Sequence, residues 1–215
     1  MPTPQATRSH PRLAVLISGR GSNLQSIIDA IEGGALDATI AVVVSSRAGA
    51  AGILRAREAG IAAVHLNPRE YPDRRAYDGA LVDLLRARAV DLVCLAGFMR
   101  LVGAVLLEAF PNRILNIHPS LLPSFPGLEA QQQALDHGVR VSGATVHLVT
   151  AELDAGPIIL QSAVPVLPDD TVDSLSARIL IEEHKIYLEA IRLVIGGGWR
   201  VEGRRLLKLS TTERL

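Results

Sequence analysis

The sequence predicts an α/β fold built on a doubly wound, mostly parallel sheet of about seven strands, with helices on both faces. Strand-like and helix-like patterns alternate along most of the chain. The strand-like runs are short, apolar and rich in β-branched residues, as in strands that are buried on both faces. The loops between them are short, which favours neighbouring parallel strands joined by right-handed crossovers.

Each strand is predicted from a short apolar run, and each helix from apolar residues three and four positions apart. The first helix has Leu24, Ile27 and Ile31 on one face, and Ser22 is its expected N-cap. Gly60 is expected to end the second helix. The predicted strands are 13–17, 39–44, 62–65, 91–95, 113–118, 142–149 and 157–164. The predicted helices are 23–32, 48–59, 74–88, 101–110, 128–137 and 172–194, and 199–209 is expected to form a small hairpin.

Composition indicates one globular domain without a nucleic-acid surface. The chain has 215 residues, of which 48% are hydrophobic and only 3% aromatic, so Leu, Val, Ile and Ala must form the core. Lys plus Arg equals Asp plus Glu at 22 each, which leaves no basic footprint for nucleic acid. No apolar run is long enough to span a membrane. We therefore expect a cytoplasmic protein, monomeric or homodimeric, with small-molecule partners.

The expected domain occupies residues 12–195, with a phosphate-binding half at 12–100 and a catalytic half at 101–195. Residues 1–11 contain three prolines and no hydrophobic signal core, and are expected to be a disordered arm. Residues 196–215 are expected to be a hairpin or tail. The single cysteine, Cys94, lies in an apolar run and is interpreted as a buried small side chain rather than a nucleophile.

The first loop that could bind a ligand joins the first strand to the first helix. It reads Ser-Gly-Arg-Gly-Ser-Asn-Leu, from Ser18 to Leu24. The free N–H groups at a helix N-terminus attract an anion, and two glycines allow a ligand to approach the backbone. Leu24 stands where the dinucleotide fingerprint needs a third glycine, so a single phosphate is the better expectation. The alternative is an ordinary glycine-rich turn.

The second loop, residues 97–101, follows the fourth strand. Phe98 and Met99 could form an apolar slot for a flat ring, and Arg100 could hold a carboxylate. A core aromatic and methionine beside a solvated arginine is the alternative, and from this loop alone it is the preferred one.

The third candidate site combines Asn116, His118 and Asp154. Asn116 and His118 are two positions apart in an extended segment, so they should point to the same side of the strand. Pro119 and Pro123 cannot continue a central strand, which should therefore end at His118. An amide, an imidazole and a carboxylate are the groups needed to move an acyl group between two nitrogens.

Other catalytic classes find little support in the sequence. There is no His-x₃-His or Cys-x₂-Cys spacing, so no metal site is expected. No Gly-x-Ser-x-Gly motif indicates a serine nucleophile. Among the remaining histidines, His147 lies near the Asp154 loop in sequence, and a structural role is the favoured interpretation. His65, His137 and His184 have no comparable setting.

These loops resemble the phosphoribosylglycinamide formyltransferase family. The resemblance is carried by Gly-Ser-Asn-Leu at 21–24, Leu-Ala-Gly-Phe-Met-Arg at 95–100, and Asn-Ile-His-Pro-Ser-Leu-Leu-Pro at 116–123. It is also carried by Pro-Gly at 126–127 and Glu-Leu-Asp-Ala-Gly-Pro-Ile-Ile-Leu-Gln at 152–161, and it runs from about 13 to 194. It implies a Rossmann-like formyltransferase fold and a role in purine biosynthesis.

The resemblance also implies ligands and residue roles. The formyl donor would be 10-formyltetrahydrofolate, a co-substrate, and the acceptor glycinamide ribonucleotide. Asn116, His118 and Asp154 would be catalytic. The ribonucleotide would be bound by Gly21, Ser22, Asn23 and Glu183. The folate would be bound by Arg74, Met99, Arg100, Leu101, Val102, Thr150, Ala151, Glu152 and Leu153.

In the expected mechanism, Asn116 and protonated His118 stabilise the negative charge that develops on the formyl oxygen. Asp154 is expected to favour the imidazolium of His118 and to relay a proton. One departure from the family is the pair Glu129 and Gln131, where relatives often carry histidines.

Three alternatives stay open. A formyltetrahydrofolate hydrolase would use water in place of the amine, but that family usually has an extra N-terminal domain. A methionyl-tRNA formyltransferase would need a C-terminal RNA-binding domain and a basic surface. A non-catalytic nucleotide-binding Rossmann-type module would keep the glycine loop without needing Asn116, His118 and Asp154.

Overall fold

The structure is a computed structural model, and it describes residues 10–209. The chain forms two compact units, the first ending at Asn116 and the second beginning at Ile117. Most of the predicted N-terminal arm, residues 1–9, lies outside the described residues, as does the end of the predicted tail, 210–215. The functional division at residue 100 stays a prediction. Within residues 10–209, no helix combines the length and apolar character that crossing a membrane requires.

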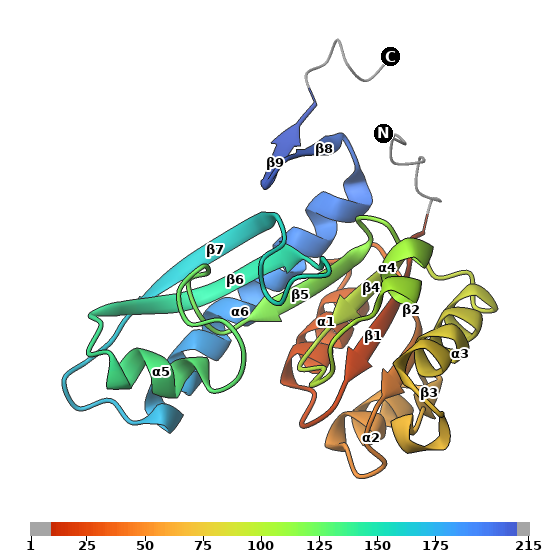
Figure 1. The fold of residues 1–215 in the computed structure, drawn as a ribbon, viewed down its shortest axis with the longest axis horizontal. Coiled ribbons are helices and arrows are strands. Elements are labelled where there is room, and N and C mark those ends of the chain that lie inside the picture. The colour runs from red at the N-terminus through yellow and green to blue at the C-terminus, as the bar shows by residue number, and fades with distance from the viewer. Residues whose placement is uncertain (1–9, 210–215) are drawn as a thin grey trace. The chain divides into compact units, whose positions relative to one another are not determined.

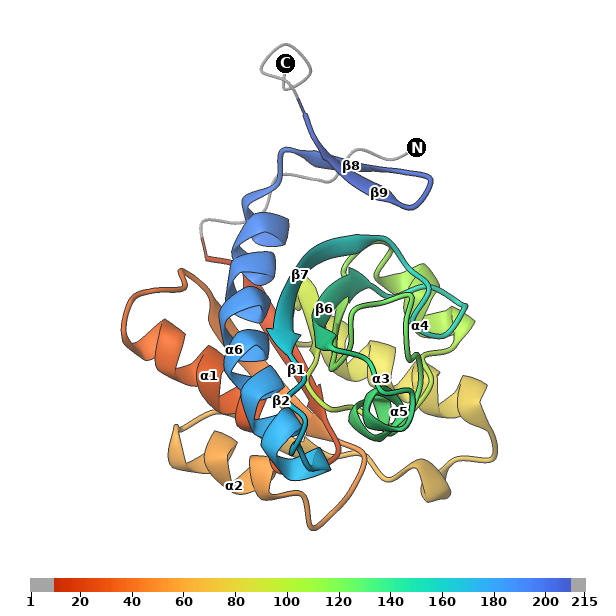
Figure 2. The same ribbon diagram turned by 90° about the vertical axis from the view of Figure 1, so that its left-hand side faces the viewer.

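The first unit contains a parallel sheet in the strand order β3-β2-β1-β4-β5 (Figure 1). Its strand β5 ends in the first residues of the second unit. Helix α1 packs against α2, and α3 against α4, and the two pairs cover opposite faces of these strands (Figure 2). The strands are β1 (Arg12–Ile17), β2 (Thr39–Ser45), β3 (Ala63–His65), β4 (Leu92–Leu95) and β5 (Ile114–His118). The helices are α1 (Ser22–Glu32), α2 (Ala51–Glu58), α3 (Arg74–Arg86), α4 (Ala104–Ala109) and the 3₁₀ turn η1 (Pro68–Glu70).

The core of this unit follows from its central strands. Leu13 through Ile17 of β1 are fully buried, because β1 has a strand on each side and helices on both faces. Cys94 of β4 is fully buried, which confirms its interpretation as a small core side chain.

The start of α1 corrects one prediction. The helix begins at Ser22, and the N-cap position is held by Gly21 with a left-handed φ of 74° and no side-chain cap. A Cβ on Gly21 would lie 2.8 Å from the Cα of Gly52, so the turn depends on two backbones in close approach. Sequence reasoning placed the cap one residue late because it looked for a side-chain acceptor.

The second unit contains the strand order β6-β7-β9-β8. β6 (Val141–Leu148) and β7 (Ile158–Pro165) are antiparallel, and α6 (Val172–Gly196) packs along both of them and against α5 (Ala130–Asp136) (Figure 1). A capping box formed by Thr171 and Ser174 fixes the start of α6. The hairpin of β8 (Trp199–Glu202) and β9 (Arg205–Lys208) adds to β7 through the pair Ile158–Arg205.

The predicted fold class is confirmed: the protein is α/β, mostly parallel, with helices covering the strands. Most elements differ from prediction only at their ends, as α2 does by starting at Ala51 rather than 48. The described residues form nine strands rather than about seven. The two additional strands are those of the hairpin, since Arg205 pairs with the free edge of β7 and extends it.

Candidate functional site

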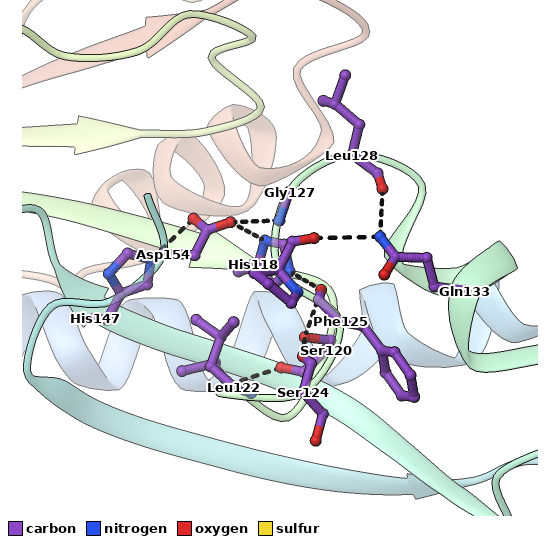
Figure 3. Close-up of polar contacts among 12 residues, drawn as sticks. His118, Ser120, Leu122, Ser124, Phe125, Gly127, Leu128, Gln133, His147 and Asp154 are labelled. Atoms are coloured by element: carbon purple, nitrogen blue, oxygen red, sulfur yellow. Dashed lines mark hydrogen bonds and ion pairs between the residues drawn. The ribbon is translucent and has the colours of Figure 1, made fainter. Parts of the chain in front are cut away.

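A buried polar cluster surrounds Asp154 in the second unit (Figure 3). Asp154 lies in the loop between β6 and β7, where its backbone takes a left-handed φ of 50°. His118 ends β5, and His147 lies near the end of β6. The side chain of Asp154 is 8% exposed, and those of the two histidines are exposed less. Three ionisable groups, from two strands and a loop, thus lie together where solvent has little access.

The carboxylate of Asp154 lies between the two imidazoles. Its Oδ2 is 3.5 Å from Nδ1 of His118, and its Oδ1 is 3.6 Å from Nε2 of His147. Both distances are longer than an ordinary hydrogen bond. The backbone N–H of Gly127 donates to Oδ2 at 2.8 Å, which fixes the carboxylate from a third direction.

The other nitrogen of each ring is already committed as a donor. Nε2 of His118 is 2.9 Å from the carbonyl oxygen of Phe125, and Nδ1 of His147 is 3.0 Å from that of Leu148. A carbonyl can only accept, so these two nitrogens carry hydrogen. In its neutral form each ring therefore turns an unprotonated nitrogen toward Asp154. When both rings are neutral, the carboxylate and the two facing ring nitrogens are all acceptors, so the cluster can take up a proton.

Burial lowers the pKa of His118 below its ordinary value of 6.5, and the nearby His147 lowers it further. The hydrogen bond to Phe125 and the charge of Asp154 act in the opposite direction and are outweighed. Asp154 favours the imidazolium of His118 through its opposite charge, as expected, but the effect of burial is larger. Sequence reasoning counted the opposite charge but could not count the loss of solvent.

Asp154 is held in its charged form. Burial alone would raise the pKa of its carboxyl group, but the contacts with His147, Gly127 and His118 outweigh burial and bring the pKa below its ordinary value. Asp154 is thus a carboxylate in the resting cluster.

A hydrogen-bond network fixes the loop that supplies the acceptor for His118. Thr145 Oγ1 donates to the carbonyl of Ser120 at 2.7 Å and accepts from the N–H of Leu122 at 3.0 Å. Gln161 Nε2 donates to the carbonyl of Leu122 at 2.8 Å. The backbone that carries Phe125 is therefore tied to β6 and β7, and with it the tautomer of His118.

His147 is the residue that sequence reasoning undervalued. Its signal was available: Thr145 and His147 alternate along β6, so both face the same side, and the Asp154 loop follows a few residues later. The sequence could not show that His147 lies beside Oδ1 of Asp154, whereas His118 and Gly127 both lie beside Oδ2.

Asn116 is the last residue of the first unit, is half-buried, and pairs in register with Leu95 of β4. The structure brings His118 and Asp154 together within the second unit. The role of Asn116 beside them stays a prediction.

The predicted phosphate loop has the expected backbone form. Gly21 precedes α1, so the loop passes directly into the N-terminus of the helix, of which Ser22 and Asn23 are the first residues. Asn23 is buried and Ser22 is half-buried. The remaining predicted ribonucleotide contact, Glu183, is buried on α6 of the second unit.

The predicted folate residues are mostly at the surface of their own units. Met99 is 58% and Leu101 53% exposed, and Leu153 of the second unit is similarly open. Thus Met99 is no core residue, and the preferred alternative for its loop is wrong on that point. Arg100 lies over the ring of Tyr77, with 5.0 Å from its guanidinium carbon to the ring centroid. Arg74, Thr150, Ala151 and Glu152 are exposed, and Val102 is half-buried.

The described residues contain no group of three or more His, Cys, Asp or Glu side chains arranged to hold a metal ion. The Asp154 cluster has three ionisable members, but their side chains face one another.

Comparison with known proteins identifies the family. Residues 11–191 match the formyl transferase family. The sequence is 46% identical to phosphoribosylglycinamide formyltransferase of Escherichia coli K12, over 89% of this chain and 88% of that protein. It is 48% identical to the trifunctional purine biosynthetic protein adenosine-3 of Bos taurus, of which it spans only 19%.

The fold agrees with the sequence match. The structure of glycinamide ribonucleotide transformylase 1 from Symbiobacterium toebii superimposes with a TM-score of 0.92 at 60% identity, covering 94% of this chain and 95% of that one. The chain therefore belongs to the formyl transferase family, a family of transferases, and within it to the phosphoribosylglycinamide formyltransferases.

Proposed function

We propose that the protein transfers the formyl group of 10-formyltetrahydrofolate to the amine of glycinamide ribonucleotide, a step of purine biosynthesis. The family and its named relatives support the reaction class. The observation that carries the proposal is the carboxylate of Asp154 between two imidazoles whose other nitrogens are committed donors. Moving an acyl group from one amine to another requires a site that accepts a proton and returns it.

The proposed reaction moves one proton from the attacking nitrogen to the leaving nitrogen. The neutral acceptor amine attacks the formyl carbon, so a carbon–nitrogen bond forms and the formyl oxygen becomes an oxyanion. The attacking nitrogen becomes positive and loses a proton to the Asp154 cluster. The bond between the formyl carbon and the folate nitrogen then breaks, and that nitrogen takes up the proton. General acid–base assistance of this kind contributes about 10²–10⁴-fold to a rate.

His118 changes its role during this cycle. With its lowered pKa it begins neutral, and Nδ1 can accept a proton. Once protonated at Nδ1 beside Asp154, the ring carries a positive charge that stabilises the oxyanion through space, while the amide of Asn116 is the proposed hydrogen-bond donor to it. One such donor contributes a factor of about 10²–10³. His147 shares the negative charge of Asp154 from the opposite side and so regulates how readily the cluster holds the proton.

Substrate binding is proposed to follow the family pattern. The N-terminus of α1, with Gly21, Ser22 and Asn23, suits a phosphate monoester, because its N–H groups and helix dipole favour an anion. Glu183 would contact the same ribonucleotide. The exposed apolar side chains of Met99, Leu101 and Leu153 suit the folate, together with Arg74, Arg100 and Val102 and with the loop residues Thr150, Ala151 and Glu152. A metal-free reaction, a cytoplasmic location and a monomeric or homodimeric state stay predictions.

The deciding experiment follows the absorbance of deformylated folate with purified protein and 10-formyltetrahydrofolate. We expect product only when glycinamide ribonucleotide is also added, in an amount equal to the formylated ribonucleotide. Folate release without ribonucleotide would make the protein a hydrolase and overturn the proposal. Thermal-shift titration separates the third possibility, since a nucleotide-binding module should respond to the ribonucleotide and not to the folate.

A further inference from the structure

Residues 97–103 follow β4 in the first unit and contain four residues proposed to bind the folate donor: Met99, Arg100, Leu101 and Val102. The side chains of Met99 and Leu101 are exposed, so packing of these side chains does little to hold the segment in place. Its backbone is nevertheless fixed at both ends by polar groups that are themselves almost completely buried.

Ser18 fixes the beginning of the segment. Its backbone N–H donates to the carbonyl of Gly97 at 3.0 Å, and its Oγ accepts from the N–H of Met99 at 2.9 Å. Ser18 is 3% exposed. Two hydrogen bonds from one residue define the path of the chain across the glycine, where φ is 73° and the backbone has unusual freedom.

The hydroxyl of Ser18 is oriented by a second serine. Its Oγ is 2.8 Å from Oγ of Ser46, which follows β2 and is also buried. The ends of β1, β2 and β4 are thereby joined by one short chain of hydrogen bonds. Such buried networks hold their members in a single arrangement when every member is satisfied.

Asp78 fixes the end of the segment. This residue of α3 is 3% exposed, and its carboxylate lies against the backbone of Gly103, which lowers the pKa of that carboxyl group against the opposing effect of burial. A Cβ at position 103 would collide with that carboxylate and press against Arg74, so the contact requires glycine. Gly103 is also the N-cap position of α4, so the segment passes directly into a helix.

The same helix supplies the surface on which the segment rests. Tyr77 is buried next to Asp78, and Arg100 lies over its ring. The positive charges of Arg74 and Arg100 both act on the carboxyl group of Asp78 and offset part of the effect of its burial. Asp78 thus places a negative charge near both arginines of the proposed donor site.

We infer that Ser18 and Asp78 are positioning residues: they hold residues 97–103 in the conformation that presents Met99, Arg100 and Leu101 to the formyl donor. Neither side chain needs to touch the donor. The inference rests on the proposed function for the identity of the donor, and on the contacts above for the rest. It predicts that damage to either anchor weakens donor binding, and that damage to Asp78, which lies outside the glycine loop, spares the ribonucleotide site.

The test uses the full-length protein with Ser18→Ala, Asp78→Ala and Asp78→Asn. Ser142→Ala is the matched control, because Ser142 is a buried serine of β6 whose Oγ has no hydrogen-bond partner in the described part of the chain. Kinetics with 10-formyltetrahydrofolate and glycinamide ribonucleotide give a KM for each substrate. We expect Ser18→Ala and Asp78→Ala to raise the donor KM by about fivefold or more, the effect of one lost hydrogen bond. In Asp78→Ala the ribonucleotide KM should stay within about twofold, and Ser142→Ala should match wild type in both KM values.

Asp78→Asn keeps an oxygen beside Gly103, so it should recover most of the donor affinity lost in Asp78→Ala. Equal increases in both KM values of Asp78→Ala, or an unchanged donor KM in Ser18→Ala and Asp78→Ala, would overturn the inference. Hydrogen exchange at the amides of Met99 and Gly103 gives an answer that does not depend on activity. Faster exchange in Ser18→Ala and Asp78→Ala supports the anchors, and unchanged exchange contradicts them. If wild type transfers no formyl group, the proposed function fails and the exchange data still decide whether the anchors exist.

Discussion

The Asp154 cluster and residues 97–103 are built in opposite ways. In the cluster, the side chains that react are buried and each is held by a hydrogen bond or a close charge. In the segment, the side chains that would meet a ligand are exposed, and it is the backbone that is held. Burial shifts pKa values and orients protons at the first, whereas exposure leaves apolar area available at the second.

The difference indicates which step each region controls. A group that moves a proton must have its energy set by its surroundings before the substrate arrives. A surface that binds a flat ring needs unused apolar area and a fixed position. Substitutions in the cluster should therefore change turnover, and substitutions in the segment should change donor affinity.

The largest effect is expected for Asp154→Asn. The amide keeps the size of the side chain but cannot accept the proton, so kcat should fall by about 10²–10⁴-fold. The ribonucleotide KM should change by less than about threefold, since the phosphate of that ligand is proposed to bind at the glycine loop and not at Asp154. Initial rates at saturating donor check both numbers. Wild-type turnover in this variant would remove Asp154 from the mechanism.

Substitution of the two histidines should lower kcat by different amounts. His118→Gln removes the proposed positive charge near the oxyanion and should lower kcat by about 10²–10³-fold. His147→Gln removes the partner that lies 3.6 Å from Oδ1 of the carboxylate and should lower kcat by about tenfold, the low end for an interaction with a charged group. Turnover measured side by side sharpens the comparison, and a larger loss in His147→Gln would reverse the assignment.

Gly103→Ala should damage the segment without touching the cluster. The added methyl group meets the carboxylate of Asp78 and the stem of Arg74, so the free energy of unfolding should fall by about 1–3 kcal/mol. The donor KM should rise with it, while kcat at saturating donor stays near wild type. Denaturant unfolding and steady-state kinetics measure the two effects, and Gly79→Ala, with open space around its Cβ, is a suitable control.

The cluster should also make stability depend on pH. The folded protein lowers the pKa of His118, so on acidification the unfolded chain binds a proton that the folded chain resists. Stability should therefore fall as pH decreases below about 6.5, the ordinary value for histidine. Asp154, whose pKa is also lowered, adds a further loss as pH falls through and below its ordinary value of 3.8. Thermal unfolding of wild type and His118→Gln between about pH 7.5 and 5.5, one unit to either side of the ordinary histidine value, should show a shallower slope in the variant.

Met99→Ala should give the smallest change in stability. The side chain is exposed, so the free energy of unfolding should change by no more than about 0.5 kcal/mol. The donor KM should still rise by a few-fold, because apolar contact area would be lost on binding. A thermal melt and a donor titration measure both quantities. An unchanged donor KM would remove Met99 from the proposed binding surface.

Sequence periodicity was sufficient for most of the fold. Alternating buried runs and amphipathic helices predicted the order of the elements, and the prolines after His118 correctly ended β5 at that residue. The hairpin at 199–208 was expected, but its addition to β7 was not, because the pairing of Ile158 with Arg205 depends on a contact between residues far apart in sequence.

For the site, the sequence could bring His118 and Asp154 together only as a hypothesis, which the 3.5 Å contact supports. It could not predict which ring nitrogen carries hydrogen, since that depends on the backbone carbonyls of Phe125 and Leu148. It also could not predict that burial outweighs the charge of Asp154 at His118. Both depend on distances and solvent access, which no spacing rule contains.

The carbonyl of Phe125 that receives the hydrogen of His118 belongs to the main chain, so no change of side chain at position 125 can delete it. The tautomer is in this sense protected against ordinary point mutation. It is sensitive instead to the length of the peptide between His118 and Phe125. Drift among homologues should therefore tolerate varied residues at position 125, while an insertion or deletion within 119–124 should be selected against far more strongly.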